Sequence, residues 1–186
     1  MARSVRTFLP VVGDPVALAA AFDGDPARWL PGARRDGQDR FVLALRAGSL
    51  TRTVRASIGA PWRAGATRWR ALSWDSISED GEHTAVDRLL PSLDGELGLH
   101  SQSGGRTTLV LDARYRPPGG ALGGAMDAVA MHRLARTTVE RFLEEVTARL
   151  AGEALLLDDG PSEAAPTGRS TTGDGPAHDR TPVGTF

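Results

Sequence analysis

The sequence contains no cysteine, no lysine and no asparagine among its 186 residues. The absence of cysteine excludes a disulfide framework, a thiolate zinc site and a cysteine nucleophile. The absence of lysine excludes the P-loop motif for phosphate binding, because that motif requires a lysine. The 22 basic residues are therefore all arginine, and they nearly balance the 23 acidic residues to give a formal net charge of -1.

Long apolar runs and basic clusters are missing too. Nowhere do about 18 apolar residues follow one another, as a membrane-spanning helix requires. The first residues, MARSVRTFLPVV, lack the apolar stretch and small-residue cleavage site of a signal peptide. Basic residues do not gather with aromatic residues along one face, as they do in nucleic-acid-binding proteins. We therefore expect a soluble, cytoplasmic protein with no membrane span and no nucleic-acid partner.

The length and the composition of the chain predict one domain and a tail. A chain of this size suffices for one domain with a hydrophobic core. From residue 158 to residue 186 the chain has five glycines, four prolines and only two sizeable apolar residues, Val183 and Phe186. Burial of so few apolar groups cannot offset the entropy lost on ordering. The sequence predicts a folded domain over residues 1–157 and a disordered tail over residues 158–186.

The order of the predicted elements indicates an α+β fold. A first strand over residues 5–12 precedes two short helices, each started by an Asp-Pro pair at Asp14 and Asp25. Apolar residues then alternate with polar ones, as in strands joined by tight turns, within residues 41–46, 53–58, 67–77, 93–99 and 108–116. After the break at Pro117 and Pro118, an amphipathic helix is expected over residues 122–150. The helix is expected to bury its stripe on the concave face of the sheet.

Several short motifs resemble those of a known superfamily. The run LPSLDGEL at residues 90–97, the run YRPPG at residues 115–119, Gly123 and the pair His132–Arg133 are similar to the SRPBCC superfamily, in an uncharacterised actinobacterial branch. That superfamily includes START, Bet v 1-like and polyketide cyclase/dehydrase proteins. The resemblance covers about residues 3–151 and implies a helix-grip fold. In that fold, a curved antiparallel sheet of six or seven strands, two short helices and a long C-terminal helix enclose a hydrophobic cavity.

The candidate ligand contacts are apolar or aromatic residues at this cavity, together with one arginine. They are Trp69, Trp74, Leu97, Leu111, Tyr115, Met126, Val129 and Arg133. Trp69 and Trp74 are five residues apart, so they point to opposite faces of a regular strand, and each serves either core packing or the cavity wall. Arg133 continues the line of Met126 and Val129 along the helix. It therefore binds a ligand oxygen or, on a rotated helix, faces solvent.

Motifs for other chemistry are weak. The glycines between residues 119 and 124 do not match GxGxxG and are read as a hinge. The four histidines lack the spacing of metal ligands, and the alternation of leucines places Asp94 and Glu96 on the solvent face. No Ser-His-Asp set is recognisable. We predict no catalytic residue, no metal site and no cofactor.

These expectations favour non-covalent binding of a hydrophobic or amphipathic small molecule in a cavity between sheet and helix. Two alternatives stay open. The first is an enzyme of the polyketide aromatase/cyclase type, in which the pocket folds a chain and a few polar groups move protons. The second is a module that binds a protein partner. The absence of a catalytic set favours binding over catalysis.

Overall fold

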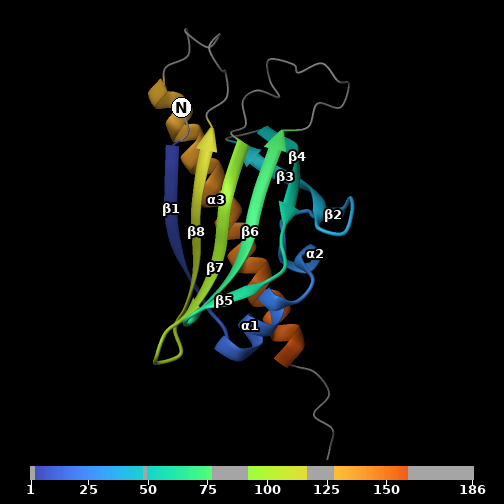
Figure 1. Cartoon of the computed structure of the whole chain (residues 1–186), viewed down its shortest axis with the longest axis vertical. Coiled ribbons are helices and arrows are strands. Elements are labelled where there is room, and N and C mark those ends of the chain that lie inside the picture. The colour runs from blue at the N-terminus through green and yellow to red at the C-terminus, as the bar shows by residue number, and fades with distance from the viewer. Residues whose placement is uncertain (1–2, 48–49, 77–91, 117–127, 159–186) are drawn as a thin grey trace, which may run out of the picture.

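The computed structural model describes residues 3–47, 50–76, 92–116 and 128–158 (Figure 1). The chain forms a sheet with two short helices at one end and a long helix behind it. In chain order the elements are β1 (Arg3–Val11), α1 (Pro15–Asp23), α2 (Pro26–Trp29), β2 (Arg34–Arg35), β3 (Arg40–Ala47), β4 (Leu50–Ile58), β5 (Trp62–Ala64), β6 (Thr67–Ser76), β7 (Ser92–Ser101), β8 (Thr107–Arg116) and α3 (Ala128–Asp158).

The strands form one antiparallel sheet in the order β1-β8-β7-β6-β4-β3-β2, with β5 paired to β6 beside this path. The curved antiparallel sheet and the C-terminal helix confirm the predicted fold class. The sheet has eight strands rather than six or seven, because β2 and β5 were not expected. With two and three residues, these two strands are too short to show a period of alternation.

The two Asp-Pro pairs start α1 and α2 as predicted. The Asp14 carboxylate accepts hydrogen bonds from the backbone N–H groups of Val16 and Ala17, at 2.9 and 2.8 Å. The Asp25 carboxylate accepts one from Ala27 at 3.0 Å. Each cap satisfies donors that the first turn of a helix leaves free, and the proline at the first helical position needs no such partner. Four large apolar residues of this segment are fully buried: Leu18, Phe22, Trp29 and Leu30.

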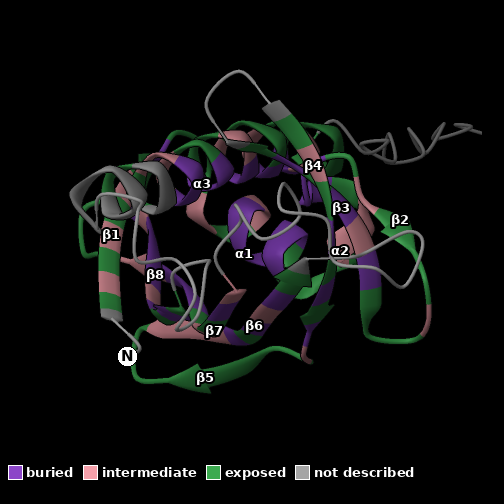
Figure 2. Cartoon of the chain, turned by 90° about the horizontal axis from the view of Figure 1, so that it is seen from above, coloured by how far each residue is buried: buried purple, intermediate pink, exposed green. Residues whose placement is uncertain are grey.

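The alternation along the strands predicted the inner face of the sheet correctly. Seen from above, the buried sides of the strands face α1 and α3 (Figure 2). The residues with less than 4% exposure are those that the pattern placed inside, among them Phe41, Leu43, Val54, Ala56, Leu97, Leu99, Leu109, Leu111 and Tyr115. The outer face carries Asp94, Glu96 and Arg114, which are all exposed.

The apolar stripe of α3 also matches the prediction over its second half. Val139, Phe142, Leu143, Val146 and Leu150 are each no more than 3% exposed. The helix runs to Asp158 and not to Leu150. Two contacts stabilise the turns of α3 after Leu150. Ala154 is buried, and Glu153 accepts a hydrogen bond from Arg28 on α2 at 2.8 Å. The predicted start at Leu122, the glycine hinge and the tail after residue 158 lie outside the described residues.

The long helix lies nearest to strands at opposite sides of the sheet. Its backbone approaches β1 and β3, and it also packs on α1 and α2. Side chains span the distance to the central strands, as when the ring of Trp74 on β6 meets that of Phe142 on α3 edge-on, with centroids 5.1 Å apart. Within the described ranges, no helix has the length and apolar character needed to cross a membrane.

Candidate functional site

A pocket of about 400 Å³ lies where β1, the end of β8 and α3 meet. Its strand side is formed by the five consecutive residues Ser4, Val5, Arg6, Thr7 and Phe8. A pocket over one face of a strand would be lined by every second residue, because side chains alternate between the two faces. Lining by consecutive residues places the pocket along the edge of β1, and among the described strands β1 pairs only with β8.

The pocket combines an apolar floor with a charged surface. Tyr115 and Val139 are 2% and 1% exposed, so they form its buried side. Arg136 donates a hydrogen bond to Glu140 one turn further along α3, at 2.7 Å, and this exposed ion pair stands where the pocket meets solvent. The hydrogen bond to Glu140, and then the charge of its carboxylate, raise the pKa of Arg136 above its usual value. An apolar interior with a few polar groups at its rim is typical of small-molecule sites.

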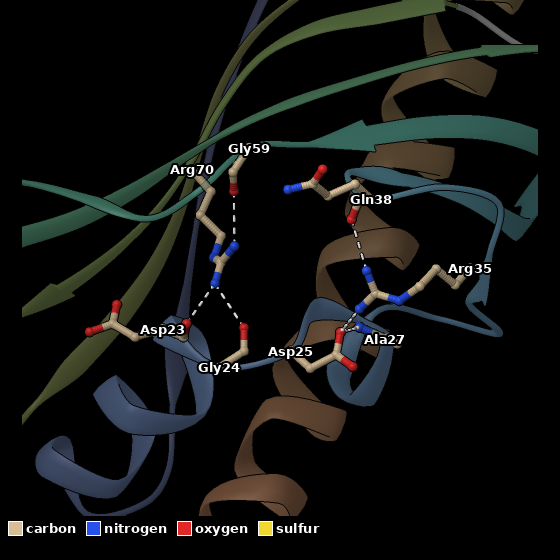
Figure 3. A network of polar contacts seen from close by, with 8 residues as sticks. All are labelled: Asp23, Gly24, Asp25, Ala27, Arg35, Gln38, Gly59 and Arg70. Carbon is tan, nitrogen blue, oxygen red and sulfur yellow. Dashed lines mark hydrogen bonds and ion pairs between the residues drawn. The ribbon is translucent and has the colours of Figure 1, made fainter.

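The other side of the interior is held by a buried arginine. Arg70 lies on the inner face of β6, is 4% exposed, and donates hydrogen bonds to four backbone carbonyls. They belong to Phe22, Asp23 and Gly24 at the end of α1 and to Gly59 after β4, with distances of 2.8 to 2.9 Å. Figure 3 shows three of these contacts, with the arginine pointing at the corner between α1 and α2.

Burial and charge act in opposite directions on this guanidinium. Burial lowers the pKa of Arg70, and the negative charges of Asp23 and Asp25 offset part of that effect. The guanidinium also lies over the rings of Phe22 and Trp29, at 5.7 and 6.0 Å from their centroids. An arginine remains charged at neutral pH. Arg70 therefore fastens α1 to the sheet, because the carbonyls at a helix C-terminus favour a positive charge.

The structure divides the predicted ligand contacts into separate groups. Trp74, Leu97 and Leu111 lie on the buried inner face, and Tyr115 lines the pocket. Trp69 lies on the outer face of the sheet, because it precedes the inward-facing Arg70 in β6. Its ring covers Gly98 on the neighbouring strand, where a Cβ atom would come within 2.6 Å of the ring. The expectation that the two tryptophans point to opposite faces is thus confirmed, with Trp74 facing inward.

The predicted contacts on α3 are less well placed. Arg133 is exposed and does not line the pocket, which matches the rotated, solvent-facing alternative. Arg136 and Glu140, next on the same line of the helix, line the pocket in its place. Met126 lies outside the described residues, and the side chain of Val129 does too, although its backbone belongs to α3.

Arg70 was missed by sequence reasoning, although the sequence carries a signal for it. It stands in the same alternation as Leu72 and Trp74, so the pattern of β6 places an arginine on the buried face. A buried charge needs partners. The partners here are backbone carbonyls up to 48 residues away in the chain, and no sequence pattern reveals them.

No protein-family model matches the sequence, and no curated protein matches it significantly. Solved structures do match its fold. The aromatase/cyclase ZhuI from Streptomyces sp. R1128 is 18% identical, with a TM-score of 0.54, over 86% of this chain and 98% of that one. The chain therefore has the fold of this structure, which is the predicted helix-grip fold.

Two further structures share this fold. The di-domain aromatase/cyclase StfQ of the steffimycin biosynthetic pathway is 12% identical, with a TM-score of 0.52, over 85% of this chain and 52% of that one. Ara h 8.0201 is 12% identical, with a TM-score of 0.50, over 84% of this chain and 99% of that one. At such low identity the likeness concerns the fold, and the predicted actinobacterial branch stays a prediction.

Proposed function

We propose that this protein binds a hydrophobic or amphipathic small molecule non-covalently between the sheet and α3, with the β1–α3 pocket as part of the site. The observation that carries the proposal is the pocket of about 400 Å³ with Tyr115 and Val139 on its buried side. A volume of that size lies within the range of small-molecule sites. The ligand would bury its apolar part against these two residues and keep its polar end beside Arg136.

The ion pair at the pocket favours ligands with an acidic or oxygen-rich end. Glu140 already accepts one hydrogen bond from Arg136, and a guanidinium has further donors available for a second acceptor. A carboxylate or phenolate on the ligand would accept a further hydrogen bond from the Arg136 guanidinium, whereas a pure hydrocarbon has no acceptor. The ligand class is therefore amphipathic rather than purely apolar.

Catalysis of the aromatase/cyclase type is the second candidate. Two of the three solved structures described above are aromatase/cyclases. This pocket holds a tyrosine and a glutamate, which are able to move protons, and an arginine, whose positive charge would stabilise an anion. Turnover of a linear polyketide-like chain into a cyclic product by the purified protein would establish the enzymatic function. Binding without turnover would leave simple ligand binding.

Ligand binding can be tested by titrating the full chain with two matched apolar fluorescent probes, one with and one without a carboxylate. We expect both to bind with a stoichiometry of one and to raise the melting temperature, since a ligand that binds only the folded state stabilises it. Arg136→Ala should weaken the acidic probe several-fold more than the uncharged probe. Arg133→Ala removes the same charge from an exposed position of the same helix that does not line the pocket, and it should leave both affinities unchanged.

Two results would contradict the proposal. One is the absence of any bound probe both in titration and in native mass spectrometry. The other is an equal loss of affinity in Arg136→Ala and Arg133→Ala, which would show that the arginines act through general charge and not at the pocket.

A further inference from the structure

The outer face of the sheet carries a continuous apolar row across five strands. Residues directly opposite one another in the sheet register form this row: Phe8 on β1, Val110 on β8, Gly98 on β7, Trp69 on β6 and Trp62 on β5. Phe8 is 57% exposed and Trp62 is 39% exposed, on the side of the sheet away from α3. Two large apolar side chains on one level of an outer face are typical of an interaction surface.

The centre of the row is packed and not left open. The ring of Trp69 covers Gly98, because only a residue without Cβ leaves room for it. Val110 beside Gly98 is 7% exposed, although its position in β8 assigns it to the outer face. The row therefore has a packed centre and an exposed aromatic side chain near each end.

Charges on the same face are sorted by strand. β1 and β8 carry Arg6, Arg114 and Arg116, and Asp112 on β8 is paired with Arg6 at 3.1 Å. β6 and β7 carry Asp75, Asp94 and Glu96 on this face, all three exposed. Within the described part of the chain, none of these three acids forms an ion pair with Arg114 or Arg116. The half formed by β1 and β8 thus carries three arginines and one aspartate, and the half formed by β7 and β6 carries three acids, with Asp94 directly opposite Arg114 in the register of β7 and β8.

We propose that this face binds a second copy of the same chain to form a symmetric dimer. The two copies are related by a two-fold axis that runs parallel to the strands, above the boundary between β7 and β8. This axis places β8 of one copy over β7 of the other and β1 over β6, and each residue stays at its own height along the strands. It places Arg114 of one copy over Asp94 of the other, and Phe8 over Trp69. A face that is basic on one side and acidic on the other is thus complementary to its own copy, as an isologous interface requires.

The size of the face predicts a weak dimer. The four strands that the axis superimposes, β1, β8, β7 and β6, span about 14 Å at about 4.8 Å per strand and extend about 30 Å, which gives roughly 400 Å² per copy. Stable interfaces bury about 800 Å² per partner. We therefore expect a dimer that depends on protein concentration and that weakens at high salt, because exposed ion pairs are screened. Aligned packing of two such sheets is a common arrangement.

Sedimentation equilibrium of the full chain over a concentration series tests the proposal. The expected mass rises from that of one copy, 19.7 kDa, toward twice that value. Arg114→Glu and Asp94→Arg should each weaken the dimer at least tenfold, because each places like charges across the axis twice. The double variant Arg114→Glu/Asp94→Arg should restore it. Trp69→Ser should weaken it as well, because the axis places Trp69 opposite Phe8 of the other copy. Circular dichroism should show that each variant is folded.

Val16→Ser is the matched control, because Val16 is an apolar residue on α1 with 76% exposure and lies away from this face. It should leave the dimer unchanged. A chain that stays at 19.7 kDa at every concentration would overturn the proposal and leave the row to a different partner. A dimer that Trp69→Ser and the charge variants do not weaken, or that the double variant does not restore, would overturn it too. Phe8 and Arg6 of this face also line the β1–α3 pocket, but none of the substituted residues does, so these variants test the dimer separately from ligand binding.

Discussion

The two sides of the space between the sheet and α3 are built differently, although the same strands and the same helix form both. On the α1–α2 side, the rings of Phe22 and Trp29 are fully buried and stack with centroids 5.5 Å apart, and Arg70 ties the end of α1 to the sheet. On the β1 side, Val5 and Thr7 are only half-buried, and a pocket of about 400 Å³ lies beside them.

This difference separates stability from binding. The side that holds α1 and α2 is filled by the stacked rings of Phe22 and Trp29 and by Arg70, whose guanidinium has four backbone acceptors, although the Trp29 Nε1–H is buried without a partner. The β1 side has a strand edge, a buried tyrosine and an exposed ion pair around one pocket. Substitutions on the first side should therefore lower the free energy of unfolding, and substitutions on the second should change ligand affinity.

The largest loss of stability is expected at the centre, where the two sides meet. Phe142→Ala removes the ring that contacts Trp74 and should lower the free energy of unfolding by about 3–5 kcal/mol. Leu97→Ala and Leu111→Ala, both on the buried face, should cost about 2–5 kcal/mol each. Urea denaturation measures these values. Leu156→Ala, at a position of α3 that is 70% exposed, is the control and should change the value by about 0.5 kcal/mol or less.

Arg70→Met should have a somewhat smaller effect on the α1–α2 side. Methionine fills similar space but leaves carbonyls of α1 and of Gly59 without their donor, and the expected loss is about 3 kcal/mol. Arg55→Met removes an exposed ion pair with Asp36 at 3.4 Å and should cost about 1 kcal/mol or less. If both variants lowered the free energy of unfolding equally, the proposed role of Arg70 in holding the end of α1 against the sheet would be contradicted. The affinity of Arg70→Met for the probes should stay as in the natural sequence, provided it is measured where the variant is folded.

The sequence alone predicted the faces of the strands and the caps of the short helices, because both depend on neighbours in the chain. Leu97 and Leu111 follow from alternation, and Asp14 follows from its place before a proline. Features that depend on distant contacts were missed. β5 is three residues long and is held by its pairing with β6, and Arg70 is satisfied by carbonyls that other elements supply.

The candidate site was predicted only in part, for a similar reason. The regular alternation of β8 places Tyr115 on the inner face, where it lines the pocket, and its contact with a ligand stays a prediction. Arg133 and Arg136 stand three residues apart on one helix, and the sequence did not determine which of them meets the pocket. The choice depends on how α3 lies against β1, which is a property of packing and not of the pattern along the helix.

Filling the β1–α3 pocket from the strand side is the most direct test of the central claim. Thr7 lines the pocket from the inner face of β1, and Thr7→Trp should occupy that space at a cost of about 1–3 kcal/mol. Thr53→Trp places the same side chain at an exposed position of β4, away from the pocket. In a calorimetric titration with the acidic probe, we predict that Thr7→Trp loses at least tenfold in affinity and that Thr53→Trp binds as the natural sequence does. Undiminished binding by a folded Thr7→Trp variant would contradict the assignment of the ligand site to this pocket.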